Sequence, residues 1–191
     1  MEQFPLLLAS SSPRRLMLLQ QIGVTPVQVV SPEIDETPCR NELPRQYAQR
    51  MAQEKALAVP SPEHLVLAAD TVVAAGRRIL PKPEDTDQVR ACLALLSGRR
   101  HRVMTAVVLA FPDGRLTHRL VESIVTFNRL TPEQIARYAA TGEGVGKAGG
   151  YAINGCAAAF IRFVSGSYSA VVGLPLFETA QLLRGAGWHV P

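Results

Sequence analysis

A run of serines followed by two arginines, Ser10 to Arg15, has the composition of an anion-binding site. Arg14 and Arg15 open a helix predicted over 14–22, with Ser12 as its N-cap and Pro13 in its first turn. Cations are disfavoured there by the positive end of the helix dipole, so a bound anion would offset the cost. Serine hydroxyls and guanidiniums would bind that anion; two solvated arginines on a frayed turn are the alternative.

Asp70 is a carboxylate inside an otherwise apolar stretch, 64–75, which we predict to be a buried strand. A buried carboxylate without a partner is very costly, so we expect Asp70 at a strand end or bulge beside a cation, a metal or water. Lys82, between two prolines, could be that partner or could bind phosphate beside it. An aspartate that only caps a loop is the alternative.

Three more charged residues could contribute to such a site. Glu33 and Asp35 face the same way in an extended segment and could hold a hard cation such as magnesium, although a solvated acidic loop explains the pair equally well. Lys55 lies on the apolar stripe of a helix predicted over 44–59. Its ammonium either reaches past its neighbours to water or points into a cleft.

Two common chemistries are not supported. Cys39, Cys92 and Cys156 stand far apart without a nearby histidine, which makes a zinc site or a disulfide framework improbable. The glycine-rich segment before Lys147 is not a Walker phosphate loop, because Thr141 stands where its first glycine is required and Ala148 where Ser or Thr is required.

The elements that must position these residues alternate between strands and helices along the chain. We predict helices over 14–22, 44–59, 85–96, 131–140 and 175–184, and strands over 5–9, 27–30, 64–75, 103–111 and 116–130, with a further extended stretch over 151–164. This order predicts an α/β fold with a mixed sheet. No repeat or linker divides the chain, so we expect a single domain over 1–191.

Composition narrows the class of protein. With 47% hydrophobic and 19% charged residues in 191, the chain has the composition of a folded protein and not of a disordered or coiled-coil one. No apolar run approaches the roughly 20 residues that cross a bilayer, and no signal peptide is recognisable, so we expect a cytoplasmic protein. The net charge of +4 fits a polyanionic partner without identifying one.

Eight short motifs, in order and nearly end to end, resemble those of the Maf family of nucleoside triphosphate pyrophosphatases, also called septum formation inhibitor proteins. They are Leu-Ala-Ser-Ser-Ser-Pro-Arg-Arg (8–15), Ile-Asp-Glu (34–36), Glu-Lys-Ala (54–56), Ala-Asp-Thr-Val-Val (69–73), Lys-Pro (82–83), Leu-Ser-Gly (96–98) with His101 and Thr105, Lys-Ala-Gly (147–149) and Val-Gly-Leu-Pro (172–175). No single motif is specific, but the ordered set is.

The resemblance implies an elongated mixed sheet flanked by helices, with two lobes around a central cleft, similar to the inosine triphosphate pyrophosphatases. It implies hydrolysis of a nucleoside triphosphate between the α and β phosphates, giving the monophosphate and pyrophosphate, with Mg²⁺ or Mn²⁺ as cofactor. It also implies removal of non-canonical or excess nucleotides, and a homodimer.

The resemblance also assigns roles to particular residues. Asp70 would accept the proton of the attacking water. The residues expected to line the triphosphate and metal site are Ser10, Arg15, Glu33, Lys55 and Lys82. We expect a single metal ion between Glu33 and Asp70.

Three positions resemble those that set base preference in the family. Arg14 and Thr71 are similar to the branch that acts on dTTP and UTP, in contrast to the 7-methyl-GTP branch. The third position, Asn154, departs from the glutamine usual in the dTTP and UTP branch. Asparagine keeps the amide that can pair with a pyrimidine but is one methylene shorter, so reading of the base could loosen or require a bridging water.

A second hypothesis is a nucleotide- or nucleic-acid-binding regulator of cell division without essential catalysis. The basic cluster Arg99 to Arg102 favours it weakly, because no aromatic residues or recognition motif accompany the cluster. A buried base at Asp70 favours the enzyme, since a binding protein does not need one.

Overall fold

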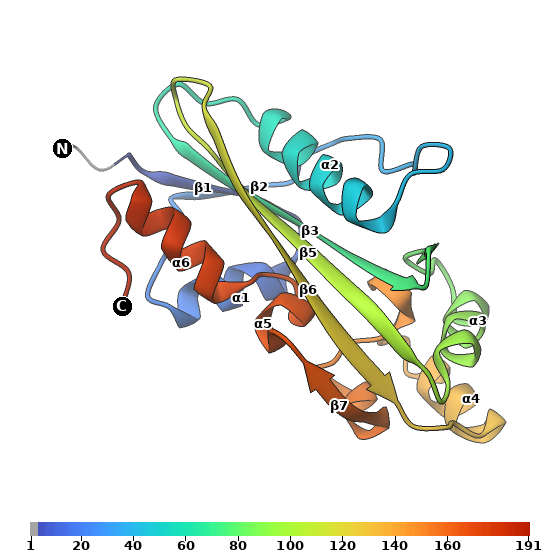
Figure 1. The fold of residues 1–191 in the computed structure, drawn as a ribbon. Helices are drawn as coiled ribbons and strands as arrows, with labels where there is room; N and C mark the ends of the chain where they lie inside the picture. Colours follow the sequence, from blue (N-terminus) through green and yellow to red (C-terminus); the bar gives the residue numbers. More distant parts are fainter. Residues whose placement is uncertain (1–3) are drawn as a thin grey trace.

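The computed structural model describes residues 4–191, which form an elongated seven-stranded mixed sheet with helices on both faces (Figure 1). The strands are β1 (Leu6–Ala9), β2 (Gln28–Val30), β3 (Leu65–Ala75), β4 (Arg78–Leu80), β5 (Arg100–Ala110), β6 (Leu116–Phe127) and β7 (Ile161–Ser165). The helices are α1 (Pro13–Gln21), α2 (Pro44–Leu57), α3 (Thr86–Leu96), α4 (Pro132–Ala140), η1 (Ala148–Gly150), η2 (Cys156–Phe160), α5 (Tyr168–Val172) and α6 (Leu176–Gly185). The predicted mixed α/β fold is confirmed.

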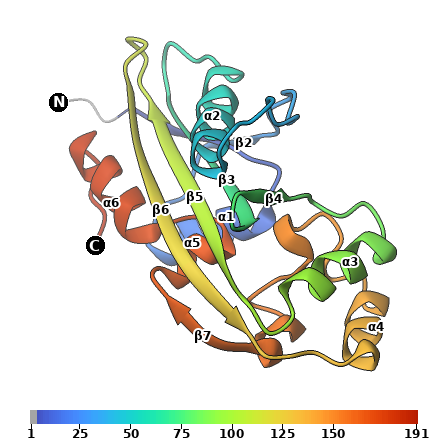
Figure 2. The ribbon, with the colours of Figure 1, turned by 45° about the vertical axis from the view of Figure 1, so that its right-hand side comes forward.

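Three long antiparallel strands, β3, β5 and β6, run the length of the molecule (Figures 1 and 2). The strand order is β2-β1-β3-β5-β6-β7, with β1 parallel to both of its neighbours. Strands β5 and β6 correspond to the strands predicted over 103–111 and 116–130, and they form an antiparallel hairpin whose turn contains Pro112, Asp113 and Gly114. Each of these strands therefore connects the two ends of the molecule through one continuous element.

One edge of β3 is shared by two short strands that do not meet. Strand β1 pairs with β3 only as far as Ala68, and β4 begins to pair at Val73. Residues 69–72 of β3 therefore have no strand beside them on this edge, while the other edge continues to pair with β5. Asp70 and Thr71 lie at this interruption, and because side chains alternate along a strand they point to opposite faces of the sheet.

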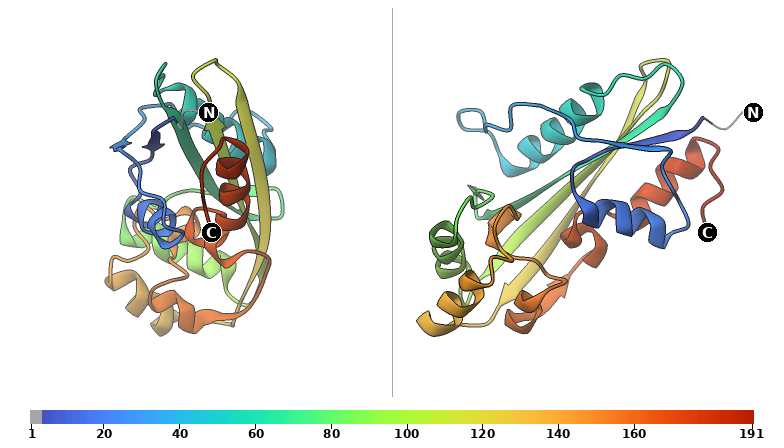
Figure 3. Two further views of the ribbon diagram at one scale, coloured as in Figure 1. Left: turned by 90° about the vertical axis from the view of Figure 1, so that its left-hand side faces the viewer. Right: turned by 180° about the vertical axis from the view of Figure 1, so that it is seen from behind.

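Separate apolar cores cover the two faces. Helix α2 packs its Ala48, Met51 and Ala52 against one face of β1, β3 and β5. Helices α1, α3 and α6 cover the opposite face, with Leu19, Leu93 and Leu183 fully buried there. Figure 3 shows these layers from the side and from behind.

The elements gather into two groups along the long strands. The group around β1, β2, α1, α2 and α6 contains Phe4 and Trp188, which are joined by a hydrogen bond from Nε1 of Trp188 to the carbonyl oxygen of Phe4, at 3.1 Å. Figure 3 shows α6 beside β1. The group around α3, α4 and β7 lies at the far end of the sheet (Figure 2). No helix within residues 4–191 is long and apolar enough to cross a membrane.

The segment 151–164 differs from its prediction. Only its end forms strand β7, while residues before it form the 3-10 helix η2, and η1 precedes them. Gly149, two residues before the segment, has a φ of +70°, and a Cβ there would lie 2.7 Å from Cγ1 of Val73. Glycine allows the backbone to turn tightly against β3. A sequence rich in small residues does not by itself show whether the backbone turns in this way or continues as a strand.

Candidate active site

A cavity of about 470 Å³ opens where β3 lacks a neighbouring strand. Its walls come from both groups of elements: the turn before α1, helix α2 and the Lys82 loop on one side, and the segment from Gly146 to Asn154 on the other. The charged side chains that line it are Arg14, Arg15, Glu36, Lys55, Lys82 and Lys147. Five cations and one carboxylate make the cavity strongly attractive to a polyanion.

Arg15 is held by neutral acceptors. Its Nε donates to the carbonyl oxygen of Gly173 at 2.8 Å, and its two terminal nitrogens donate to Oγ of Ser10 at 3.2 Å and to Oγ1 of Thr71 at 3.4 Å. Oγ1 of Thr105 lies 3.1 Å from Oγ1 of Thr71. We call Ser10, Arg15, Thr71 and Thr105 the arginine–hydroxyl network. It fixes the guanidinium without neutralising it.

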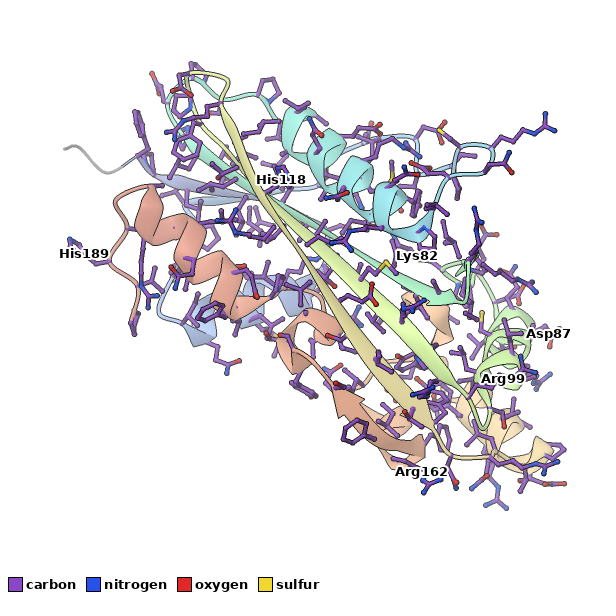
Figure 4. All side chains as sticks on the ribbon, viewed as in Figure 1. Lys82, Asp87, Arg99, His118, Arg162 and His189 are labelled. Carbon is purple, nitrogen blue, oxygen red and sulfur yellow. The ribbon has the colours of Figure 1, made fainter. Side chains whose placement is uncertain are left out.

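Lys55 lies between two carboxylates. Its ammonium is 2.6 Å from Oδ1 of Asp70 and 2.7 Å from Oε1 of Glu36, and the residue is only 5% exposed. Lys82, which lies between α2 and α3, pairs with the other oxygen of Glu36 (Figure 4). We call Glu36, Lys55, Asp70 and Lys82 the lysine–carboxylate cluster. The inward orientation of Lys55, one of its two predicted alternatives, is therefore the one observed.

The structure corrects the expected surroundings of Asp70. The residue is 2% exposed and lies within β3, paired opposite Ala106 in regular register, and not at a strand end or bulge. The interruption of the β3 edge places Asp70 next to the cavity, although Lys55 separates its carboxylate from the open space. Its cationic partner is Lys55 and not Lys82, because α2 packs directly over this face of β3.

The acidic segment also differs from expectation. Glu33 and Asp35 are exposed, and neither lines the cavity; Glu36, three residues beyond Glu33, points inward. The structure thus brings Glu36, and not Glu33, together with Asp70. Glu36 stands in the Ile-Asp-Glu motif, which was the available sequence signal, but the segment 31–43 contains no helix or strand whose period could show which carboxylate faces in.

The surroundings of the cavity shift the pKa values of its acidic and basic side chains. Burial alone would raise the pKa of Glu36, but hydrogen bonds from Lys55 and Lys82 outweigh it and lower that pKa to about 2. Burial lowers the pKa of Arg15, an effect that the Asp70 carboxylate opposes. Among residues 4–191, no carboxylate forms an ion pair with Arg14, Arg15 or Lys147. Their charge is therefore available to a bound anion.

The wall opposite the lysine–carboxylate cluster contains the residues expected to contact a base. Asn154 and Lys147 line the cavity together with Arg14. Burial, followed by the charge of Arg14, lowers the pKa of Lys147, and Nε of Arg14 is buried without a partner in the described structure. Lys147 stands in the Lys-Ala-Gly motif (147–149), but no role in the site was predicted for it from the sequence.

Tyr151 is a second lining residue that sequence reasoning did not single out. Its hydroxyl lies 2.7 Å from Nε2 of His101, and both rings pack edge-on against Phe127. Burial lowers the pKa of His101 to about 4, so the ring is neutral at physiological pH. This buried aromatic cluster supports the cavity wall from behind.

The residues that could hold a divalent cation are Glu36 and Asp70. Residues 4–191 contain no group of three or more His, Cys, Asp or Glu side chains arranged around a common point. Two carboxylates that reach the same ammonium nevertheless match the way magnesium is commonly bound, through one or two carboxylates together with substrate phosphates.

Comparisons with known proteins agree over nearly the whole chain. The Maf-like protein family matches residues 5–186. A dTTP/UTP pyrophosphatase of Gluconobacter oxydans is 62% identical over 187 residues, covering 94% of this chain and 86% of that protein. A dTTP/UTP pyrophosphatase of Paramagnetospirillum magneticum is 58% identical over 185 residues, covering 96% and 97%.

Solved structures give a more distant likeness. A nucleoside-triphosphatase described as a dITP/XTP pyrophosphatase, from Mycobacterium abscessus, is 21% identical with a TM-score of 0.42, over 66% of this chain and 74% of that one. The Ham1 protein of Staphylococcus aureus is 14% identical with a TM-score of 0.45, over 64% and 71%.

Proposed function

Because this chain belongs to the Maf family, we propose that it is a nucleoside triphosphate pyrophosphatase that acts on dTTP and UTP. Its relatives named dTTP/UTP pyrophosphatase, at 62% and 58% identity, support the choice of substrate. The observation that carries the proposal is the buried Asp70–Lys55 pair beside a cavity lined by five cations. A triphosphate brings about four negative charges, which such a cavity can screen while a carboxylate accepts a proton.

In the proposed reaction, the oxygen of a water molecule bonds to the α phosphorus and the bond to the α–β bridging oxygen breaks. The proton of the water passes to the Asp70 carboxylate, and the nucleoside monophosphate and pyrophosphate are released. Arg15 grips phosphate oxygens with the N–H groups that its protein acceptors leave free. Lys55 and Lys82, on flexible stems, transfer from their carboxylates to the charge that develops on the leaving pyrophosphate.

Asp70 itself does not line the cavity, because Lys55 lies in front of it. We propose that arrival of the triphosphate draws the Lys55 ammonium toward the phosphates and opens the carboxylate to the attacking water. Glu36 and Asp70 would hold a Mg²⁺ or Mn²⁺ ion together with phosphate oxygens. Such an ion, when bound, would screen the phosphates and make its coordinated water more acidic.

Base preference is proposed to depend on Arg14, Thr71 and Asn154, all of which line the cavity. The side-chain amide of Asn154 can donate and accept, as the edge of uracil or thymine requires. We propose that the enzyme removes excess or non-canonical pyrimidine nucleotides and that it acts as a homodimer. Light scattering coupled to gel filtration would measure its mass in solution.

The test is an assay of purified protein with Mg²⁺ or Mn²⁺ and a panel of dTTP, UTP, CTP, GTP and 7-methyl-GTP. Pyrophosphate, orthophosphate and nucleoside monophosphate are measured separately. We expect equal amounts of pyrophosphate and monophosphate, fastest from dTTP and UTP. Orthophosphate with a diphosphate product would place the cleaved bond elsewhere.

The competing regulator of division would give a different result. Its basic cluster lies at the far end of the sheet from α2, where Figure 4 labels Arg99, and none of its residues lines the cavity. If no triphosphate releases pyrophosphate while DNA binds with a steep dependence on salt, the regulator replaces the enzyme as the better proposal.

A further inference from the structure

Thr105 is a fully buried threonine near the middle of β5, directly opposite Thr71 of β3. It does not line the cavity, and its hydroxyl is bonded to protein groups on both sides. Its hydroxyl oxygen lies 2.7 Å from the carbonyl oxygen of Ala170 and 3.1 Å from Oγ1 of Thr71. Thr105 thus connects the short helix α5 to a residue of the proposed substrate site.

The carbonyl of Ala170 requires a donor from outside its helix. Helix α5 has only five residues, and the amide of Leu174, which would reach Ala170 if the helix continued regularly, donates to the carbonyl of Ser169 instead. The last carbonyls of a helix have no partner within it. The hydroxyl of Thr105 satisfies this carbonyl, and the short 2.7 Å distance indicates a well-formed bond.

This bond fixes the direction of the whole hydroxyl chain. A threonine hydroxyl has a single hydrogen, and a carbonyl oxygen can only accept. Thr105 therefore gives its hydrogen to Ala170, and the hydrogen between the two threonines must come from Thr71. Thr71 is left with lone pairs only, and one of them faces Arg15 at 3.4 Å. A Thr71 hydroxyl free to rotate could instead turn its hydrogen toward the guanidinium and repel it.

We propose that Thr105 is a positioning residue for substrate binding: by taking the hydrogen of Thr71, it keeps that hydroxyl an acceptor for Arg15 and holds the guanidinium in place to bind phosphate. The inference rests on the proposed function, since it assigns Arg15 to a triphosphate. It predicts that Thr105 influences affinity for the phosphate chain and leaves the chemical step largely unchanged.

Thr105→Val tests this with little change of shape. One lost hydrogen bond corresponds to roughly a 5- to 10-fold effect, so we expect KM for dTTP to rise by about that factor while kcat changes less than about 2-fold. The Kd of inorganic tripolyphosphate, measured by calorimetry without turnover, should rise equally. Thr105→Ser keeps the hydroxyl and should restore both values.

Ser123→Ala is the matched structural control. Ser123 is 1% exposed and holds the start of α5, accepting from the amide of Ser167 at 3.0 Å, but it does not contact Thr71. The Ser123→Ala variant should loosen α5 without disturbing the hydrogen bonds among Thr71, Thr105 and Ala170. If Ser123→Ala raises KM as much as Thr105→Val does, movement of α5 explains the effect and the proposal is overturned.

A double variant isolates the route through Arg15. Lysine at position 15 lacks the terminal guanidinium nitrogen that bonds Thr71, so Thr105→Val should add less than about 2-fold to Kd in an Arg15→Lys background. Full additivity would overturn the proposal, as would a wild-type protein that binds no tripolyphosphate. A wild-type protein that binds tripolyphosphate but releases no pyrophosphate from dTTP would refute the proposed function alone, and the Kd ratios would still decide the role of Thr105.

Discussion

The two faces of β3 beside the cavity solve the problem of a buried charge in different ways. On one face, the lysine–carboxylate cluster pairs every ammonium with a carboxylate, so the charges neutralise one another. On the other, the arginine–hydroxyl network surrounds Arg15 with a backbone carbonyl and two hydroxyls, which satisfy its donors but leave its charge intact. Asp70 and Thr71, neighbours in sequence, belong to opposite sides of this division.

The difference indicates a division of labour. A guanidinium held by neutral groups is already positioned for an anion and needs no rearrangement to bind one. Lysines paired with carboxylates must exchange partners when an anion arrives, and that exchange exposes a carboxylate as a base or metal ligand. The arginine–hydroxyl network should therefore govern binding, and the lysine–carboxylate cluster should govern turnover.

Asp70→Asn, in the lysine–carboxylate cluster, should have the largest effect, and that effect should be on turnover. We expect kcat to fall about 1,000-fold, because the amide keeps the shape but cannot accept a proton, while Kd for tripolyphosphate changes only a few-fold. Steady-state assays and calorimetry measure the two quantities. Asp87→Asn, an 83% exposed side chain on α3, is the control and should behave as wild type. Equal losses of binding and turnover would mean that Asp70 is no more than a structural partner of Lys55.

Arg15→Lys should have the next largest effect, and that effect should be on substrate binding. Lysine keeps the charge but loses the bonds to Gly173 and Thr71, so we expect kcat/KM to drop about 100-fold, mainly through KM. Arg14→Lys is the comparison variant, since Arg14 makes no such set of bonds. The distinction between the two arginines would be refuted by equal losses in both variants.

Glu36→Gln should reduce turnover about 10- to 100-fold, because a neutral amide holds Lys55 and Lys82 less tightly and is a poor metal ligand. Glu33→Gln, three residues away and exposed, should stay within about 2-fold of wild type. Parallel assays of the two variants at several Mg²⁺ concentrations measure this. A larger loss from Glu33→Gln would return the metal site to the residue expected from sequence.

The smallest expected effect is on the pH dependence of the free energy of unfolding, and it is measured with the same two variants, Glu36→Gln and Glu33→Gln. The folded-state pKa of Glu36 is lowered from 4.5 to about 2, so its contribution is present above about pH 4.5 and is lost as the pH falls toward 2. Its side chain is 38% exposed, and water and salt screen the pair, so we expect no more than about 1 kcal/mol. Urea unfolding between pH 7 and 2 should show the wild type and Glu36→Gln converging in acid, with Glu33→Gln parallel to wild type throughout.

Local sequence was a reliable guide to the helices and the long strands, although not to the extended stretch predicted over 151–164. Helix α1 spans Pro13–Gln21, close to the predicted range 14–22, although the Ser12 side chain makes no capping bond. Helix α4 starts at the predicted place, where Thr131 caps it by accepting a hydrogen bond from the amide of Gln134. The placement of Lys55 on an apolar stripe correctly marked it as unusual. These features depend on residues within a few positions of one another, where helix and strand periods hold.

Only the tertiary structure decided which of these residues meet. Arg15 bonds Gly173, 158 positions away in sequence, and Asp70 pairs with Lys55 because α2 packs over that face of β3. Glu36 replaced Glu33 because the loop that carries them has no regular period to fix its inward face. The sequence by itself determined the types of chemical group, the elements that bear them and, through the alternation of β3, that Asp70 and Thr71 face opposite ways. Their partners depended on where β1 stops and β4 begins along β3, because long-range pairing and packing set that interruption and no local pattern records it.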